Sequence, residues 1–220
     1  MGLSIDHFVW AASDLDHGNA IIEKIFGVQP MQGGSHPGLG TRNSLVSLGP
    51  KTYLEVIAPD LGSISPNSPG DRLRQLKAPG LMTWVYRSDG LNKLAQLTQD
   101  SLSVLTPIGP IKTQRETADG EMLAWELLFV TQHEFGGLMP FFIDWQDTAH
   151  PSLSAPYGGQ CKEVRLRSPD AALLNPALNV FDVDVPVTLA SEAAIEVEIT
   201  TSTGNIVLTS TAETLQLALI

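Results

Sequence analysis

The sequence has little of three features that mark particular protein classes. It holds one cysteine, Cys161, so an internal disulfide bond is excluded and a cytoplasmic location is the default expectation. It has 13 Lys and Arg against 24 Asp and Glu, and the net charge of -11 argues against a nucleic-acid partner and against an anionic membrane surface. No apolar run approaches the length of a membrane span, and a basic-then-apolar signal pattern is missing at the N-terminus.

Several catalytic motifs are also missing. The chain has no Gly-rich phosphate loop followed by Lys, no dinucleotide fingerprint and no serine in a nucleophile elbow. Cys161 has only Lys162 as a basic neighbour, so a catalytic thiol is not expected. What the chain does have is 43% hydrophobic and 17% charged residues over 220 positions, a composition typical of packed globular proteins.

The order of predicted elements repeats along the chain. A strand is predicted at residues 3–12 and a helix that stops at Gly27 at residues 13–26. Three further strands are predicted at residues 29–32, 43–48 and 52–58. The same order returns at residues 81–87, 91–98, 109–117, 122–130 and 139–145. A partial third unit has strands at 162–167, 183–189, 194–200 and 205–210, and a short helix at 171–174. We therefore predict an α+β fold of repeated βαβββ modules, with modules at 1–80 and 81–155 and a partial third β-rich module at 156–220.

Two predicted strands of the first module carry a polar residue inside an apolar run. His7 lies in Ile5-Asp6-His7-Phe8-Val9-Trp10, and Glu55 lies in Tyr53-Leu54-Glu55-Val56-Ile57. A buried imidazole or carboxylate requires a partner, so we expect a small-molecule or metal site at the sheet surface. The alternative is that His7 and Glu55 bind each other or backbone groups at the wall of a cleft.

The motifs together resemble the glyoxalase-like proteins of the vicinal oxygen chelate superfamily. The matching segments are Ile5-Asp6-His7-Phe8-Val9, Gly33-Gly34-Ser35-His36-Pro37, Gly40-Thr41-Arg42-Asn43, Tyr53-Leu54-Glu55, Asp119-Gly120, Leu123-Ala124-Trp125, Phe142-Ile143-Asp144-Trp145 and His150-Pro151-Ser152. The resemblance implies paired βαβββ modules whose curled mixed sheets enclose a cleft. It also implies a homodimer, because members of this superfamily often build their clefts between chains.

In the metal-dependent members, the ligands come from the first and last strands of each module. By this resemblance His7 and Glu55 are the metal ligands of the first module, and Asp144 is the ligand of the second if Phe142-Ile143-Asp144 mirrors Tyr53-Leu54-Glu55. The first strand of the second module offers no usual ligand, so at most three of the four expected positions are filled. Imidazole and carboxylate suit Fe, Mn, Ni or Zn equally, and the sequence does not choose among these divalent ions.

Two further histidines are candidate catalytic residues. His36 lies in a glycine-rich segment and could be a ligand, a general base or a substrate contact, or a solvated loop residue. His150 follows the last predicted strand of the second module. It could replace the missing ligand or carry a proton, or it could cap a turn before Pro151.

Five other residues are candidate substrate contacts. Asn43 could anchor a carbonyl or hydroxyl group, although an Asn at this position also suits a turn cap. Arg115 could clamp an anionic group or could form an ion pair at the surface. Trp84, Trp125 and Trp145 could wall an apolar pocket, and we expect at least one of them to be an ordinary core residue.

These residues support two main functions. The first is a metal-dependent glyoxalase-like enzyme of lyase, isomerase or dioxygenase type that acts on a small oxygenated organic compound. The second is a protein of the same fold that binds or sequesters a small molecule without chemistry. A degenerate module that serves only as an assembly surface is a third interpretation.

Overall fold

The computed structural model describes residues 3–36, 38–100, 105–116, 122–217 and 219. The first half of the chain contains β1 (Ser4–Ala11), α1 (Leu15–Phe26), β2 (Met31–His36), β3 (Thr41–Ser47) and β4 (Tyr53–Pro59). After a short helix, α2 (Pro69–Leu73), the second half contains β5 (Gly80–Arg87), α3 (Leu91–Asp100), β6 (Thr106–Glu116), β7 (Met122–Thr131) and β8 (Phe141–Asp144). Both halves therefore have the predicted βαβββ order.

Helix α1 stops before Gly27, as the sequence predicts, and begins at Leu15, two residues after the predicted start at residue 13. The side chain of Asp14 accepts a hydrogen bond from the backbone N–H of His17, which caps the first turn. Gly27 ends the helix with a φ of 71°, a left-handed conformation that glycine adopts without steric cost.

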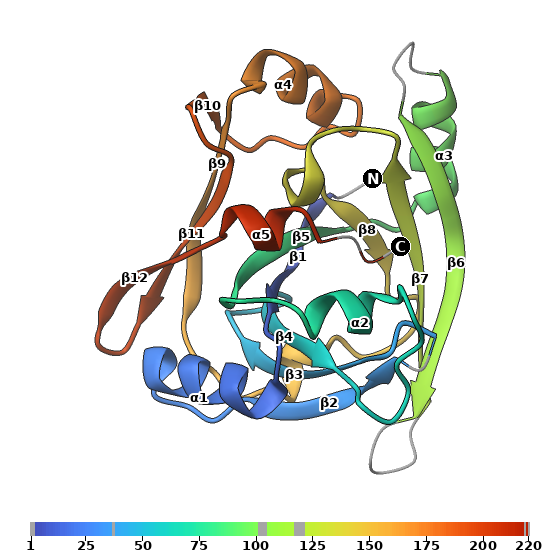
Figure 1. The fold of residues 1–220 in the computed structure, drawn as a ribbon. Coiled ribbons are helices and arrows are strands. Elements are labelled where there is room, and N and C mark those ends of the chain that lie inside the picture. Colours follow the sequence, from blue (N-terminus) through green and yellow to red (C-terminus); the bar gives the residue numbers. More distant parts are fainter. Residues whose placement is uncertain (1–2, 37, 101–104, 117–121, 218, 220) are drawn as a thin grey trace.

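The eight strands of the two halves form one curled sheet with the order β2-β3-β4-β1-β5-β8-β7-β6. Within each half, the first strand runs parallel to the last, as β1 does to β4 and β5 to β8. The halves meet where β1 pairs antiparallel with β5. The sheet curls so far that its edge strands β2 and β6 touch (Figure 1). The concave face of this sheet is the cleft.

Most of the rest of the chain covers the convex face, whereas Leu217 and Leu219 pack on the concave side. This part of the chain contains β9 (Gln160–Ser168), α4 (Ala171–Asn179), β10 (Val187–Leu189), β11 (Ala194–Thr201), β12 (Gly204–Thr209) and α5 (Ala212–Leu215). Two short 3-10 helices lie before it in the chain, at Gly136–Leu138 between β7 and β8 and at Pro151–Leu153 after β8. The second sheet has the order β10-β9-β11-β12. Its first strand runs parallel to β10 and not to its last strand, so its pairing differs from that of the first two modules.

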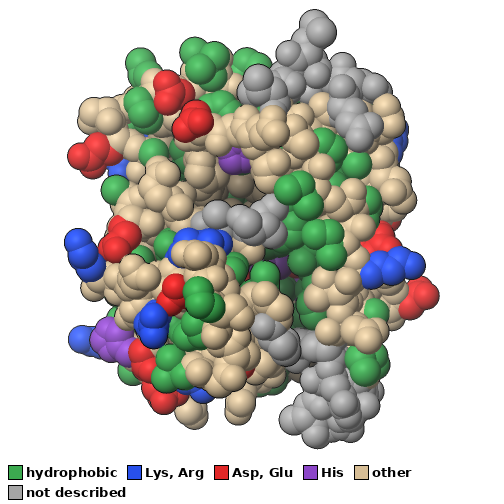
Figure 2. Space-filling view, turned by 45° about the vertical axis from the view of Figure 1, so that its right-hand side comes forward, with side chains coloured by type: hydrophobic (Ala, Val, Ile, Leu, Met, Phe, Trp, Pro, Cys, Tyr) green, Lys and Arg blue, Asp and Glu red, His purple; other side chains and the backbone are tan. Residues whose placement is uncertain are grey.

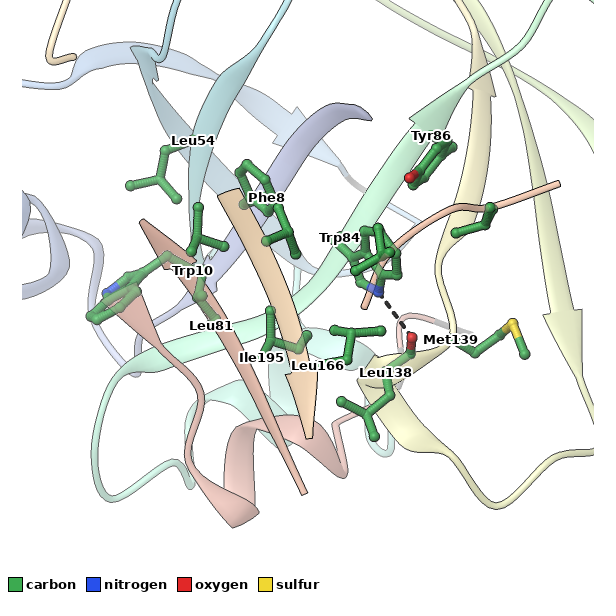
Figure 3. Close-up of a cluster of buried hydrophobic side chains, with 14 of the residues drawn as sticks. Phe8, Trp10, Leu54, Leu81, Trp84, Tyr86, Leu138, Met139, Leu166 and Ile195 are labelled. Carbon is green, nitrogen blue, oxygen red and sulfur yellow. Dashed lines mark hydrogen bonds between the residues drawn. The ribbon is translucent and has the colours of Figure 1, made fainter. Parts of the chain in front are cut away.

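The main hydrophobic core lies between the two sheets. Phe8 and Trp84 of the curled sheet pack in one cluster with Leu166 and Ile195 of the four-stranded sheet (Figure 3). A second apolar cluster, which includes Trp125, Phe141 and Trp145, lies on the concave face. Among the helices that the structure describes, none is long and apolar enough to cross a membrane.

Candidate functional site

The concave face holds a cavity of about 430 Å³. The first half of the chain contributes mostly polar groups to its wall, and the second half contributes mostly apolar ones. The polar groups include His7, His36, Asn43 and Glu55, and the apolar ones include Trp125, Leu127, Phe129, Phe141, Ile143 and Trp145. In the space-filling view, hydrophobic side chains gather around a hollow in which a histidine side chain is visible (Figure 2). The cavity therefore suits a small ligand with an apolar body and a polar end.

His7 and Glu55 lie together on this wall, as the sequence predicts. Nε2 of His7 is 3.6 Å from Oε2 of Glu55, and both side chains are buried. The parallel pairing of β1 with β4 explains this, because His7 is in register with Tyr53, two residues before Glu55. Side chains two residues apart on a strand face the same side.

The second oxygen of Glu55 is held by Asn43. Nδ2 of Asn43 donates to Oε1 of Glu55 at 2.6 Å, and Oδ1 of Asn43 accepts from the backbone N–H of Gly34 at 2.8 Å. Asn43 is thus an anchor inside the cavity wall and not a turn cap. Oε2 of Glu55 is the oxygen that faces His7.

The imidazole of His7 is held on its other side by Asp6. Nδ1 of His7 donates to Oδ1 of Asp6 at 2.7 Å, and the imidazole stacks on the ring of Tyr53 at 4.5 Å. Adjacent strand residues normally point to opposite faces, but a bulge in the pairing of β1 with β5 falls between Ile5 and His7. Such a bulge re-aims a side chain, which lets Asp6 and His7 meet.

Asp6 accepts from four donors, and we call this arrangement the Asp6 hub. Besides His7, its Oδ2 accepts from Nε2 of His150 at 3.1 Å, from Nε1 of Trp145 at 3.1 Å and from Nη1 of Arg87 at 3.4 Å. Its burial raises the pKa of the carboxyl, but the hydrogen bonds from His150 and His7 outweigh it and hold the pKa of Asp6 well below its ordinary value. Asp6 is therefore a buried carboxylate.

The two candidate catalytic histidines differ in position. His36 lies at the end of β2 and lines the cavity, with Nδ1 3.0 Å from Oγ1 of Thr41. His150 caps the 3-10 helix at Pro151–Leu153 by accepting from the backbone N–H of Ser152, as the turn-cap alternative predicts. His150 also binds Asp6, so it supports the site from behind the cavity wall.

Asp144 and Trp84 do not lie at the cavity, and both predictions need correction. On β8 the residues that face the cavity are Phe141 and Ile143, so Asp144 points away and accepts from the backbone N–H of Gln146. The register expected between Asp144 and Glu55 is therefore wrong by one residue, because alternation along the strand reverses the side. Trp84 lies in the convex core, where its Nε1 donates to the carbonyl oxygen of Leu138 at 2.9 Å (Figure 3).

The other substrate-contact candidates fall on the second half. Trp125 and Trp145 both line the cavity, with ring centroids 5.6 Å apart. Arg115 pairs with Leu123 through its backbone, but its side chain lies outside the described part of the structure. Cys161 is remote from the cavity, and burial raises the pKa of its thiol to about 11, in keeping with the expectation that it is not a nucleophile.

Sequence reasoning missed Asp6, Tyr53, Phe129, Phe141 and Lys112. Alternation along a strand predicts that Asp6 faces away from His7, and only the bulge in β1 brings the two side chains together. Tyr53 is two residues before Glu55 on the same strand, which is a signal that could have placed it on the cavity wall. Lys112 lines the cavity from β6 and is the one lysine among the lining residues that the structure describes.

A divalent metal ion is only partly matched by these residues. The symmetry of the two halves relates His7 to Val85, which face each other across the β1–β5 pair, and relates Tyr53 to Phe141, so Glu55 corresponds to Ile143. The second half thus places two aliphatic side chains where the first half has imidazole and carboxylate. Within the described ranges, no group of three or more His, Cys, Asp or Glu side chains could hold a metal. The expected set of ligands is therefore not formed by these residues.

Comparison with known proteins agrees with the architecture. A family model described as a glyoxalase-like domain matches residues 5–180. No curated protein matches this chain at a significant level. A hypothetical protein from Staphylococcus aureus superimposes with a TM-score of 0.66 at 20% identity, over 94% of this chain and 84% of that one.

Two other solved structures match about two thirds of this chain. A hypothetical protein from Bacillus halodurans C-125 matches with a TM-score of 0.50 at 13% identity, over 68% of this chain and 99% of that one. Methylmalonyl-CoA epimerase from Mycobacterium tuberculosis matches with a TM-score of 0.48 at 16% identity, over 64% of this chain and 87% of that one. Since the family model spans most of the sequence, the chain belongs to the glyoxalase-like domain family, as its resemblance to the vicinal oxygen chelate proteins predicts.

Proposed function

We propose that this chain is an enzyme that moves a proton on a small oxygenated organic compound, as a lyase or an isomerase. The observation that carries the proposal is the 3.6 Å separation of His7 Nε2 and Glu55 Oε2 at one cavity wall. Two proton-accepting groups at this separation can both contact one substrate atom that is bound in front of them. The apolar wall opposite them would hold the body of the substrate.

The chemistry would run between these two side chains. One of them removes a proton from a carbon next to a carbonyl group, and the electron pair of the C–H bond moves onto the carbonyl oxygen. The side chain that took the proton then returns it to a neighbouring atom of the substrate. The hydrogen bond from Asn43 fixes the orientation of Glu55 during both transfers.

A metal is not required by this scheme, and the donor set supports that form of the proposal. His7 and Glu55 lie 3.6 Å apart in the cavity wall, and His36 is not close enough to join them in a group of three ligands among the described residues. The positions related to His7 and Glu55 by symmetry are Val85 and Ile143. Elemental analysis of the purified protein tests this point. Stoichiometric Fe, Mn, Ni or Zn that is lost in both His7→Ala and Glu55→Ala would restore the metal-dependent form.

The non-catalytic binder is the second candidate, because apolar side chains make up much of the cavity wall. Proton exchange separates it from the enzyme. The protein is incubated in D₂O with a panel of small 2-hydroxy ketones and 2-oxo acids, and deuterium incorporation at carbon is followed by NMR. The enzyme exchanges at least one compound, and His7→Gln and Glu55→Gln reduce the rate by about 100-fold or more. Binding of a compound without exchange would favour the binder.

Two wider expectations also stay proposals. We propose a cytoplasmic location and a homodimer, the first from the single cysteine and the second from the resemblance to the superfamily. Sedimentation of the purified protein at several concentrations checks the second.

A further inference from the structure

The hydrogen bonds around Asp6 determine which atom of His7 faces the cavity. An ionised carboxylate only accepts hydrogen bonds, so the nitrogen that lies 2.7 Å from Oδ1 of Asp6 must carry a hydrogen. That nitrogen is Nδ1 of His7. A neutral imidazole has one N–H, and its other nitrogen, Nε2, then carries a lone pair.

The second histidine of the Asp6 hub is fixed in the opposite way. Nδ1 of His150 accepts from the backbone N–H of Ser152 at 3.2 Å, so it cannot carry a hydrogen there. The hydroxyl of Ser152 accepts from the backbone N–H of Lys51 at 3.0 Å and is 2.8 Å from the same Nδ1, to which it donates. His150 therefore keeps its hydrogen on Nε2 and donates it to Asp6.

Glu55 presents an acceptor to the same point. Its Oε1 is bound by Asn43, and its Oε2 lies 3.6 Å from Nε2 of His7, which is beyond the range of a direct hydrogen bond. The two atoms thus face one another without a direct hydrogen bond between them. Such a pair is stabilised when a donor hydrogen lies between its members.

We propose that Asp6 is the positioning residue of the site, which locks His7 in its Nδ1–H form and so makes His7 Nε2 and Glu55 Oε2 a paired acceptor for a ligand hydroxyl. The inference deepens the proposed function, on which its meaning for catalysis rests. It states that the recognised end of the substrate is a hydrogen-bond donor. It also makes His7 the group that can take the first proton.

The tautomer of His7 is measured directly by ¹⁵N NMR of histidine-labelled protein near neutral pH, with the His7→Gln variant to assign the signal. The expected result is a protonated Nδ1 and an unprotonated Nε2 in His7, and the reverse in His150. An Nε2–H form or an imidazolium at His7 would overturn the inference. Because this measurement needs no substrate and no variant of Asp6, its failure is distinct from the failure of the exchange test.

The role of Asp6 is tested with Asp6→Asn, and Asp144→Asn is the matched control because it changes a carboxylate outside the cavity. The amide offers a donor where the hub needs an acceptor, so the His7 signal is expected to lose its single Nδ1–H form in Asp6→Asn and to keep it in Asp144→Asn. An unchanged His7 tautomer in a folded Asp6→Asn protein would contradict the assignment. If Asp6→Asn does not fold, two measurements on the wild-type protein still decide the question. They are the tautomers of His7 and His150 and the binding of benzyl alcohol. Binding should exceed that of benzyl methyl ether, which lacks the hydroxyl hydrogen, and equal binding of the two compounds would contradict the paired acceptor.

Discussion

Asn43 donates a hydrogen bond of 2.6 Å to Glu55 inside the wall of the cavity, and its other amide atom is bound by the backbone of Gly34. One side chain thus links β2, β3 and β4 at the point where the proposed chemistry takes place. The polar end of the cavity is held by such links and by the Asp6 hub, while the apolar end is held by packing.

Replacing Asn43 with Ala should lower the free energy of unfolding by about 1–3 kcal/mol, because a buried Glu55 oxygen and the N–H of Gly34 both lose their partners. Urea denaturation measures the change. Asn205→Ala is the control, since Asn205 also donates to a glutamate, Glu198, but at an exposed position. It should change stability by less than about 0.5 kcal/mol. Equal effects at both sites would show that the Asn43 link is not buried in solution.

A methyl group at Gly33 should also disrupt the hydrogen bonds of Asn43, because it would collide with the Asn43 side chain. A Cβ at this position would come within 2.0 Å of Oδ1 of Asn43, whereas a Cβ at Gly38 would meet nothing within 4 Å. Gly33→Ala is therefore expected to destabilise the protein by about 1–3 kcal/mol, through displacement of Asn43 or of β2. Gly38→Ala should be close to neutral, and thermal unfolding of the two variants compares them. A neutral Gly33→Ala would contradict the close approach of β2 to Asn43.

The Asp6 hub should make stability depend on acid. Because the pKa of Asp6 is lowered on folding, the unfolded chain binds the proton first as the pH falls. The stabilisation is complete above the unfolded pKa of about 3.9 and is lost as the pH falls from there through the folded pKa. Asp6→Asn should cost about 3 kcal/mol or more at neutral pH and should flatten the loss of stability below about pH 4.

Urea midpoints measured between pH 7 and pH 3 check this dependence. Asp144→Asn, which leaves the Asp6 hub intact, should follow the wild-type curve more closely than Asp6→Asn does. A wild-type slope in Asp6→Asn would mean that other carboxylates determine the response to acid.

Substitutions of the tryptophans should have different effects on the two faces of the curled sheet. Trp84→Phe loses a buried hydrogen bond to Leu138 and part of the convex core, so it should destabilise the fold by about 2 kcal/mol and leave ligand binding unchanged. Trp125→Ala removes part of the cavity wall and should weaken the binding of benzyl alcohol several-fold. Saturation-transfer NMR measures the binding. Loss of binding in Trp84→Phe at temperatures where it is folded would place Trp84 at the cavity after all.

The paired modules could be predicted from sequence because local signals agree with the fold. Asp14 and Gly27 mark the ends of α1, and the βαβββ order repeats in both halves. His7 and Glu55 could be placed together once the first and last strands of a module were taken as neighbours. The separate divisions at residues 80 and 155 stay a prediction.

Other features depend on single-residue register, which the sequence does not reveal. A one-residue difference on β8 sends Asp144 away from the cavity and leaves Ile143 facing it. A bulge in β1 brings Asp6 beside His7 against the rule of alternation. Trp84 lies on the core side of a strand whose two faces are both apolar, so its pattern alone could not choose between core and cavity.

The central claim is that His7 and Glu55 act as one unit, and a double-mutant cycle of carbon exchange in D₂O tests it most directly. Groups that share one reaction step are strongly non-additive when removed. The account predicts that His7→Gln with Glu55→Gln exchanges about as slowly as the slower single variant. Rate losses that multiply in the double variant, or exchange that survives in it at the wild-type rate, would contradict the account.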